Sequence, residues 1–140
     1  MHKKVIPGFI VVYIVMSLMN FVIHNVLLKE TYMQLVQTGL MRGEEAGTMW
    51  IYFVTGLVVS FFFTLIFSKG YNGSGVGEGV RYGLYVGILM ATPFAYNSYA
   101  SYPLPYHLVL QWFLYTTIMY VILGVIVAAV FGKSKGATAG

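Results

Sequence analysis

The chain of 140 residues contains no cysteine and no aspartate, and only 9% of its residues are charged. Without cysteine it has no disulfide framework, no thiolate nucleophile and no cysteine-ligated zinc or iron–sulfur centre. Soluble domains carry about 25% charged residues, so this composition cannot cover a surface that faces water. Apolar residues make up 59% of the chain and the mean hydropathy is +0.78, which predicts a protein that is embedded in lipid.

Four apolar runs predict four membrane crossings, because a transmembrane helix needs about 20 mostly apolar residues. We expect an all-α fold, a single four-transmembrane-helix bundle over residues 1–140, with spans at 5–28, 49–67, 79–99 and 107–131. The first run is longer than the core of a signal peptide, so we expect it to be retained. Of the connections, 29–48 has room for a short surface helix near 32–37, 68–78 is rich in glycine, and 100–106 is tight.

The basic residues predict the orientation of the bundle. With four crossings, both termini and the 68–78 loop lie on one side, which carries six of the eight Lys and Arg residues. Positively charged loops stay in the cytoplasm, so we expect both termini there. The net charge of +4 is then a topology signal, and we expect no nucleic-acid partner. At the opposite edge an interfacial aromatic belt is expected from Trp50, Tyr96, Tyr99, Tyr102, Tyr106 and Trp112.

Small residues recur at every fourth position of the third predicted span: Gly79, Gly83, Gly87, Ala91 and Ala95. Positions four apart lie on one helix face, and small side chains let two helices approach closely in a membrane. We expect this face to pack inside the bundle, with a contact between two copies of the chain as the alternative. Pro93 should kink the same helix, because proline lacks a backbone N–H.

A polar stripe follows one face of the first span and should point to the bundle interior: Tyr13, Ser17, Asn20 and His24. Together with Asn97, His107 and Gln111 it predicts a polar pocket near the outer face. Two histidines at one depth can ligate a haem or a metal. Neither has a second ligand on its own helix, so we expect no shared cofactor. The alternative is a hydrogen bond from His24 to a tyrosine or a backbone carbonyl, with His107 in the aromatic belt.

The connection 68–78 and its surroundings carry two further patterns. Its glycine-rich stretch lacks the spacing and the lysine of nucleotide-binding loops, and no strand precedes it, so we expect a flexible turn. Glu78 and Arg81 are three residues apart and are predicted to pair at the inner membrane edge, unless Arg81 extends to lipid headgroups. No Glu, Lys or Arg lies near the middle of a predicted span, which argues against a pump, a proton-coupled transporter or an enzyme.

Three motifs carry a resemblance to known proteins. They are Ser68-Lys69-Gly70 continuing through Gly75-Val76-Gly77-Glu78-Gly79-Val80-Arg81-Tyr82-Gly83-Leu84, then Tyr102-Pro103-Leu104-Pro105, and Gln111-Trp112-Phe113. Spread over the second to fourth predicted spans, they resemble a family of small, uncharacterised four-helix bacterial inner-membrane proteins. The resemblance implies a bacterial plasma membrane and supplies no activity and no functional residues.

Two functions stay open at this point. The small size, the apolar surface and the packing face favour a non-enzymatic structural or accessory subunit that oligomerises or docks on a larger membrane complex. The alternative is the binding or transport of a lipid, a small molecule or a cofactor in the polar pocket. The expected partners are membrane lipids, together with a second copy of the chain or a larger membrane complex.

Overall fold

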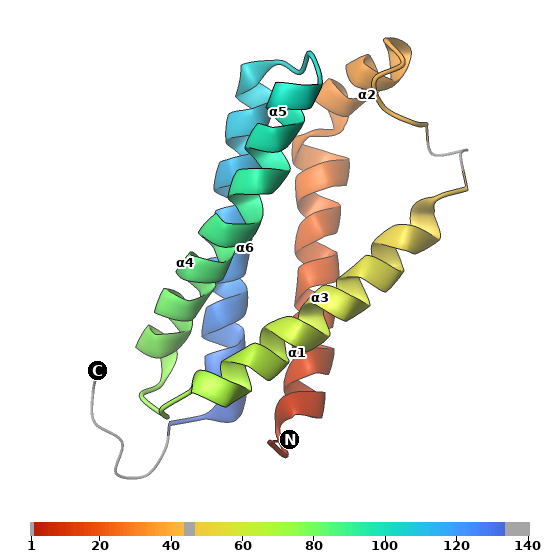
Figure 1. The fold of residues 1–140 in the computed structure, drawn as a ribbon. Helices are drawn as coiled ribbons and strands as arrows, with labels where there is room; N and C mark the ends of the chain where they lie inside the picture. The colour runs from red at the N-terminus through yellow and green to blue at the C-terminus, as the bar shows by residue number, and fades with distance from the viewer. Residues whose placement is uncertain (1, 44–46, 134–140) are drawn as a thin grey trace.

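The computed structural model describes residues 2–43 and 47–133, which are helical and contain no β-strand. In chain order (Figure 1) the elements are α1 (Val5–Val22), η1 (Ile23–Leu27), α2 (Lys29–Gln37), α3 (Met49–Gly70), α4 (Val76–Thr92), η3 (Pro93–Asn97), α5 (Ser98–Ser101) and α6 (Tyr106–Phe131). The two elements written η are π-helical turns. We call the end of the bundle that holds α2 and α5 the α2 end. The opposite end, with the turn between α3 and α4, is the turn end (Figure 1).

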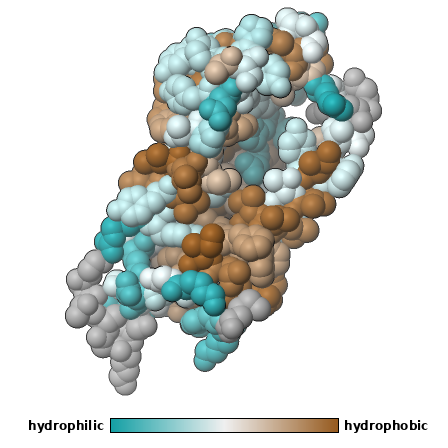
Figure 2. All heavy atoms as spheres, viewed as in Figure 1, coloured by the Kyte–Doolittle hydropathy of each residue, from teal (hydrophilic) through white to brown (hydrophobic). Residues whose placement is uncertain are grey.

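Three helices among the described residues are long and apolar enough to cross a membrane: Val5–Leu27, α3 and α6. Apolar residues accordingly gather over the middle of the face in Figure 2, and hydrophilic ones lie towards its ends. Residues 79–99, the third predicted span, are not among the helices that meet this criterion. They belong to α4, η3 and α5, and α4 is less apolar than α1, α3 or α6, since it contains Glu78, Arg81 and regularly spaced glycines.

The small-residue face of α4 lies against α6, and the two helices run antiparallel (Figure 1). A Cβ atom built on Gly83 would stand 2.8 Å from the Cα of Val121, and one on Gly79 would stand 2.6 Å from the Cβ of Ala128. On α6 the matching position is Gly124, where an added Cβ would stand 3.0 Å from the Cα of Gly83. The whole face is buried within the chain: Gly79, Gly83, Gly87, Ala91 and Ala95.

The helix that begins as α4 changes its hydrogen-bonding pattern at Pro93, where η3 starts. Proline has no N–H to donate to the carbonyl four residues earlier, and a π-helical turn accommodates such a gap within a continuous helix. At Pro93, where a kink was expected, the helix therefore contains a π-helical turn. A second π-helical turn, η1, ends α1 at the same end of the bundle.

Helix α3 packs closely only over the half near the turn end. There Phe63 and Phe67 contact Tyr82 of α4, with ring centroids 4.8 and 5.2 Å apart. The Tyr82 hydroxyl also donates to the carbonyl of Phe63 at 2.6 Å. Towards the α2 end, α3 leans away from the other helices (Figure 1), and its residues 49–55 are all exposed. Residues 49–55, which we call the exposed half of α3, thus lie outside the bundle, and the contacts of α3 begin at Gly56, against the Tyr13 ring.

Two hydrogen bonds close the turn end. The Lys4 ammonium group donates to the carbonyl of Phe131 at 3.0 Å, and the Tyr71 hydroxyl donates to the carbonyl of Gly132 at 2.8 Å. The last carbonyls of a helix have no partner within the helix, so Lys4 satisfies one of them and places a positive charge at the negative end of the α6 dipole. The start of α1 is thereby fastened to the end of α6.

The glycine-rich turn between α3 and α4 is held by Glu78. Its two carboxylate oxygens accept hydrogen bonds from the backbone N–H of Asn72 at 2.7 Å and of Ser74 at 3.1 Å. Glu78 lies in the first turn of α4, where the helix dipole also favours a negative charge. Glu78 therefore orders the turn, and its pairing with Arg81 stays a prediction.

Candidate functional site at the α2 end

Three side chains from three helical elements form a hydrogen-bonded chain at the α2 end. The indole Nε1–H of Trp112 on α6 donates to the phenol oxygen of Tyr32 on α2 at 2.6 Å. The same oxygen lies 2.6 Å from Nδ1 of His24 on η1. The rings of His24 and Tyr32 are stacked, with centroids 5.7 Å apart. This chain, which we call the Trp–Tyr–His chain, fastens α2 to the ends of α1 and α6.

One direction in this chain is fixed by its donor. An indole N–H can only donate, so the Tyr32 oxygen accepts from Trp112. Its own hydrogen is free to donate to Nδ1 of His24 in the tautomer that carries its hydrogen on Nε2. Burial raises the pKa of Tyr32 to about 12, so the phenol keeps its hydrogen at neutral pH.

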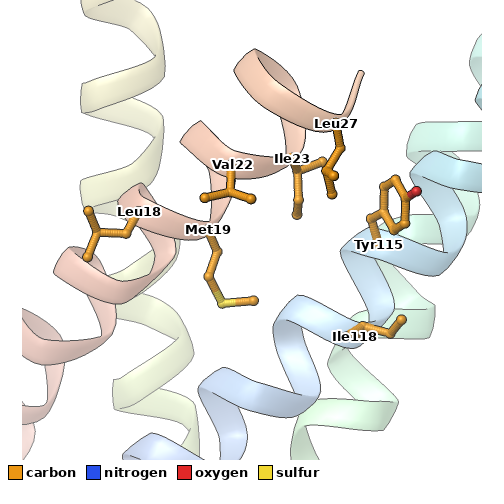
Figure 3. A pocket seen from close by; sticks show the side chains of 7 residues that line it. All are labelled: Leu18, Met19, Val22, Ile23, Leu27, Tyr115 and Ile118. Carbon is orange, nitrogen blue, oxygen red and sulfur yellow. The ribbon is translucent and has the colours of Figure 1, made fainter. Parts of the chain in front are cut away.

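An apolar groove of about 320 Å³ lies between α1 with η1 on one side and α6 on the other (Figure 3). Except for the Tyr115 ring, every side chain along it is aliphatic or thioether. The lining residues are Leu18, Met19, Val22, Ile23, Leu27, Tyr115 and Ile118. A groove of this composition in two membrane-spanning helices is suited to hydrocarbon and not to water.

Gln111 lies one helical turn before Tyr115, on the same face of α6 and towards the α2 end. Its Oε1 atom is buried and finds no hydrogen-bond partner within 2–43 and 47–133. A buried acceptor without a donor costs about 1–3 kcal/mol. Gln111 therefore holds a buried acceptor that the described residues do not satisfy, and it is not among the residues that line the groove.

The seven residues predicted to line one polar pocket lie in different surroundings. The Tyr13 ring packs against Gly56 of α3, 3.2 Å from where a Cβ atom would stand. The others divide by burial: Ser17, Asn20, His24 and Gln111 are partly buried, whereas Asn97 and His107 are exposed. The structure brings His24 into the Trp–Tyr–His chain and leaves His107 on the surface.

Hydrogen bonds and apolar surface are what this site supplies chemically. No group of three His, Cys, Asp or Glu side chains within the described ranges is placed to hold a metal ion. Nδ1 of His24 faces a tyrosine hydroxyl, which is one of the two alternatives given for this residue.

The sequence pattern predicts a short surface helix near residues 32–37 and an aromatic belt that includes Trp112, and neither feature connects Tyr32 or Trp112 to His24. The available signal was the amphipathic pattern of α2, in which Tyr32 and the buried Leu35 share one face. Comparisons with protein-family models, curated proteins and solved structures match nothing to this chain, so its own geometry carries the functional argument.

Proposed function

We propose that the chain is a non-enzymatic protein of the bacterial plasma membrane that crosses the bilayer four times and associates with a further transmembrane helix. Three crossings correspond to the apolar helices Val5–Leu27, α3 and α6. The fourth follows from chain direction, because α3 ends at the turn end and α6 begins at the α2 end. The helical stretch 76–101 measures about 39 Å at 1.5 Å per residue, longer than a hydrocarbon core of about 30 Å.

The proposed orientation places the turn end in the cytoplasm. Lys4, Lys69, Arg81 and Lys133 lie at that end, whereas Lys29 and Arg42 lie at the other. The positive-inside rule therefore supports cytoplasmic termini. Cysteines introduced at Thr48 and Ser74 of the cysteine-free chain should react with an impermeant maleimide from opposite sides of the membrane. Labelling of both positions in intact cells would contradict the orientation.

The exposed half of α3 carries the association proposal. In a membrane, helices associate through close packing and not through a hydrophobic effect, so a helix half that packs on nothing leaves that stabilisation unused. Trp50, Tyr52 and Phe53 expose 62%, 68% and 59% of their surface. Phe63 and Phe67 fix the other half of α3. The helix is therefore anchored at the turn end and leans away from the bundle at the α2 end. A transmembrane helix from a second copy or from another subunit is the proposed occupant.

Cross-linking from single cysteines tests this proposal directly. Phe53→Cys on the exposed half of α3 and Leu89→Cys on α4, a residue 71% exposed, are matched lipid-accessible positions. A short bifunctional maleimide in native membranes should give one discrete product from position 53 and none from position 89. Mass spectrometry of that product then distinguishes a second copy from another subunit. Equal products from both positions, or none from either, would sink the proposal.

A second candidate function is lipid or small-molecule binding, and a specific observation favours it. The groove between α1 and α6 is apolar along its length, which suits an acyl chain or another apolar body. This function is independent of the exposed half of α3, because the groove lies between other helices.

A further inference from the structure

We infer that two copies of the chain exchange the exposed half of α3. The exposed half from one copy enters the opening between α1 and α3 of the other, where its Trp50 donates a hydrogen bond to Asn20. The inference rests on the proposed association of the exposed half of α3 and names the occupant as a second copy. It is carried by an unpaired amide on α1, an unpaired indole on α3, and the level at which both groups lie.

The opening begins where α3 leaves α1. The Tyr13 ring of α1 packs against Gly56, and beyond that contact α3 leans away towards the α2 end (Figure 1). Positions four and seven residues after Tyr13 lie on the same face of α1, and they hold Ser17 and Asn20. Figure 2, drawn from the same side, shows a hollow between α3 and the α2 end with hydrophilic surface inside it. The polar face of α1 is therefore directed into the opening.

Asn20 brings an unpaired amide into this opening. Its side chain is partly buried and forms no hydrogen bond within residues 2–43 and 47–133. Asn20 stands seven residues before Leu27, about 10 Å along the helix at 1.5 Å per residue, so it lies inside the hydrocarbon core. An amide without a partner is costly there, and asparagine side chains in membrane helices form hydrogen bonds across to neighbouring helices. The amide therefore needs a partner that its own copy does not supply.

The exposed half of α3 carries a matching donor. Trp50 exposes 62% of its surface, and its indole N–H, which can only donate, meets no acceptor within the described part of the chain. Counted from the contact between Tyr13 and Gly56, Asn20 lies seven residues towards the α2 end and Trp50 lies six, about 10.5 and 9 Å at 1.5 Å per residue. Side chains point towards the N-terminus of their helix, so the indole reaches towards the α2 end and the amide towards the turn end. The two groups therefore lie at one level of the membrane.

A second copy meets both requirements at once. Trp50 is six residues before Gly56, which turns its side chain about 120° away from the face that meets α1 of its own copy. Two copies cross the membrane in the same direction, so Trp50 of one lies at the level of Asn20 of the other. The exchange is reciprocal and closes with two copies, in the helix order α1, α3 of the second copy, α3, and α1 of the second copy. A single helix from another protein would have to supply an acceptor for Trp50 and a partner for Asn20 together.

The test measures the affinity between copies in a lipid bilayer. The full chain is labelled with a donor or an acceptor fluorophore at Gly77→Cys, where nothing lies within 4 Å of the new Cβ atom, and energy transfer is followed as the chain is diluted in liposomes. A two-fold dimer contains the bond from Trp50 to Asn20 twice. Each bond corresponds to about a fivefold change in affinity, so Asn20→Leu and Trp50→Phe should each weaken association roughly 25-fold. Asn25→Leu, an exposed asparagine on η1, is the matched control and should associate as the parent does.

Mixing the two variants separates a bond between copies from a general loss of packing. A pair of one Asn20→Leu chain and one Trp50→Phe chain keeps one of the two bonds, so it should associate about fivefold more tightly than either variant does with itself. If Asn20→Leu does not fold, Asn20→Ala removes the same amide. Variants that associate as the parent does, a mixed pair no tighter than the separate variants, or a parent that stays monomeric would overturn the inference. If Phe53→Cys cross-links to another protein while the parent stays monomeric, helix association stands and only the exchange fails.

Discussion

The contact between α4 and α6 makes the sharpest quantitative prediction, because its tolerance for a single methyl group can be calculated position by position. At Gly83 an added Cβ would approach the Cα of Val121 to 2.8 Å and the carbonyl oxygen of Tyr120 more closely still. Both are backbone atoms of α6, which cannot move aside as a side chain does. Gly83→Ala must therefore push the two helices apart.

The expected loss is at the upper end of overpacking costs, about 3 kcal/mol. Gly87→Ala is milder, because its nearest neighbours, the Cα and carbonyl oxygen of Thr117, lie 3.0 Å from the new Cβ. We expect about 1 kcal/mol there. Gly77→Ala is the matched control on the same helix, since nothing lies within 4 Å of its Cβ position. It should be neutral or stabilising by up to ~1 kcal/mol through helix propensity.

The assay is reversible unfolding in mild detergent as a function of added sodium dodecyl sulfate, followed by circular dichroism. The reasoning predicts the order of stability Gly77→Ala, then Gly87→Ala, then Gly83→Ala. Gly83→Leu should be worse than Gly83→Ala. If Gly83→Ala and Gly77→Ala unfold together with the parent, α4 does not pack on α6 through this face and the packing argument fails.

Three further predictions follow from hydrogen bonds. Tyr32→Phe leaves the indole N–H of Trp112 without its acceptor and should cost about 1–3 kcal/mol, whereas Tyr102→Phe at an exposed position should cost nothing measurable in the same unfolding assay. Burial raises the folded-state pKa of Tyr32 to about 12 from an ordinary value of 10.0. The contribution of Tyr32 to the free energy of unfolding should therefore be complete below pH 10 and lost between pH 10 and 12. Trp112 emission in a Trp50→Phe background should change over the same pH window, and Tyr32→Phe should remove this transition. Tyr82→Phe removes the hydrogen bond to the carbonyl of Phe63 and should lower the free energy of unfolding by about 1 kcal/mol. The loss should also loosen α3, which faster proteolysis would detect. Tyr85→Phe, on the exposed side of α4, should behave as the parent.

The sequence was most informative about the helices that a lipid environment requires. Backbone polar groups in hydrocarbon must bond within their own helix, so long apolar runs predicted α1, α3 and α6 closely. Residues 79–99 form a less apolar helix, because α4 packs through glycines against α6 and so carries fewer of the side chains that make a span apolar. The glycine spacing still predicted a close contact, and the structure supplied its partner, the backbone of α6 around Gly124.

The lean of α3 and the Trp–Tyr–His chain could not be predicted in the same way. Helix α3 is apolar around its whole circumference, so no pattern tells which face meets the bundle or where contact stops. Trp112 and Tyr32 are 80 residues apart in sequence, and their meeting depends on how α2 folds back over the end of α1. The stripe on α1 identified His24 as a residue facing inwards, but local spacing cannot supply a partner on another element.

The bond between Lys4 and Phe131 has a consequence for how the protein is made. Because α1 is synthesised long before α6, the carbonyl that Lys4 binds is absent while the intervening helices are made. Until then the ammonium group of Lys4 stays among water and headgroups, as a snorkelling lysine does. The turn end is closed only when α6 arrives. The step that joins the start of α1 to the end of α6 therefore follows the synthesis of the helices between them, and Lys4→Met should slow this step while insertion of the individual helices proceeds normally.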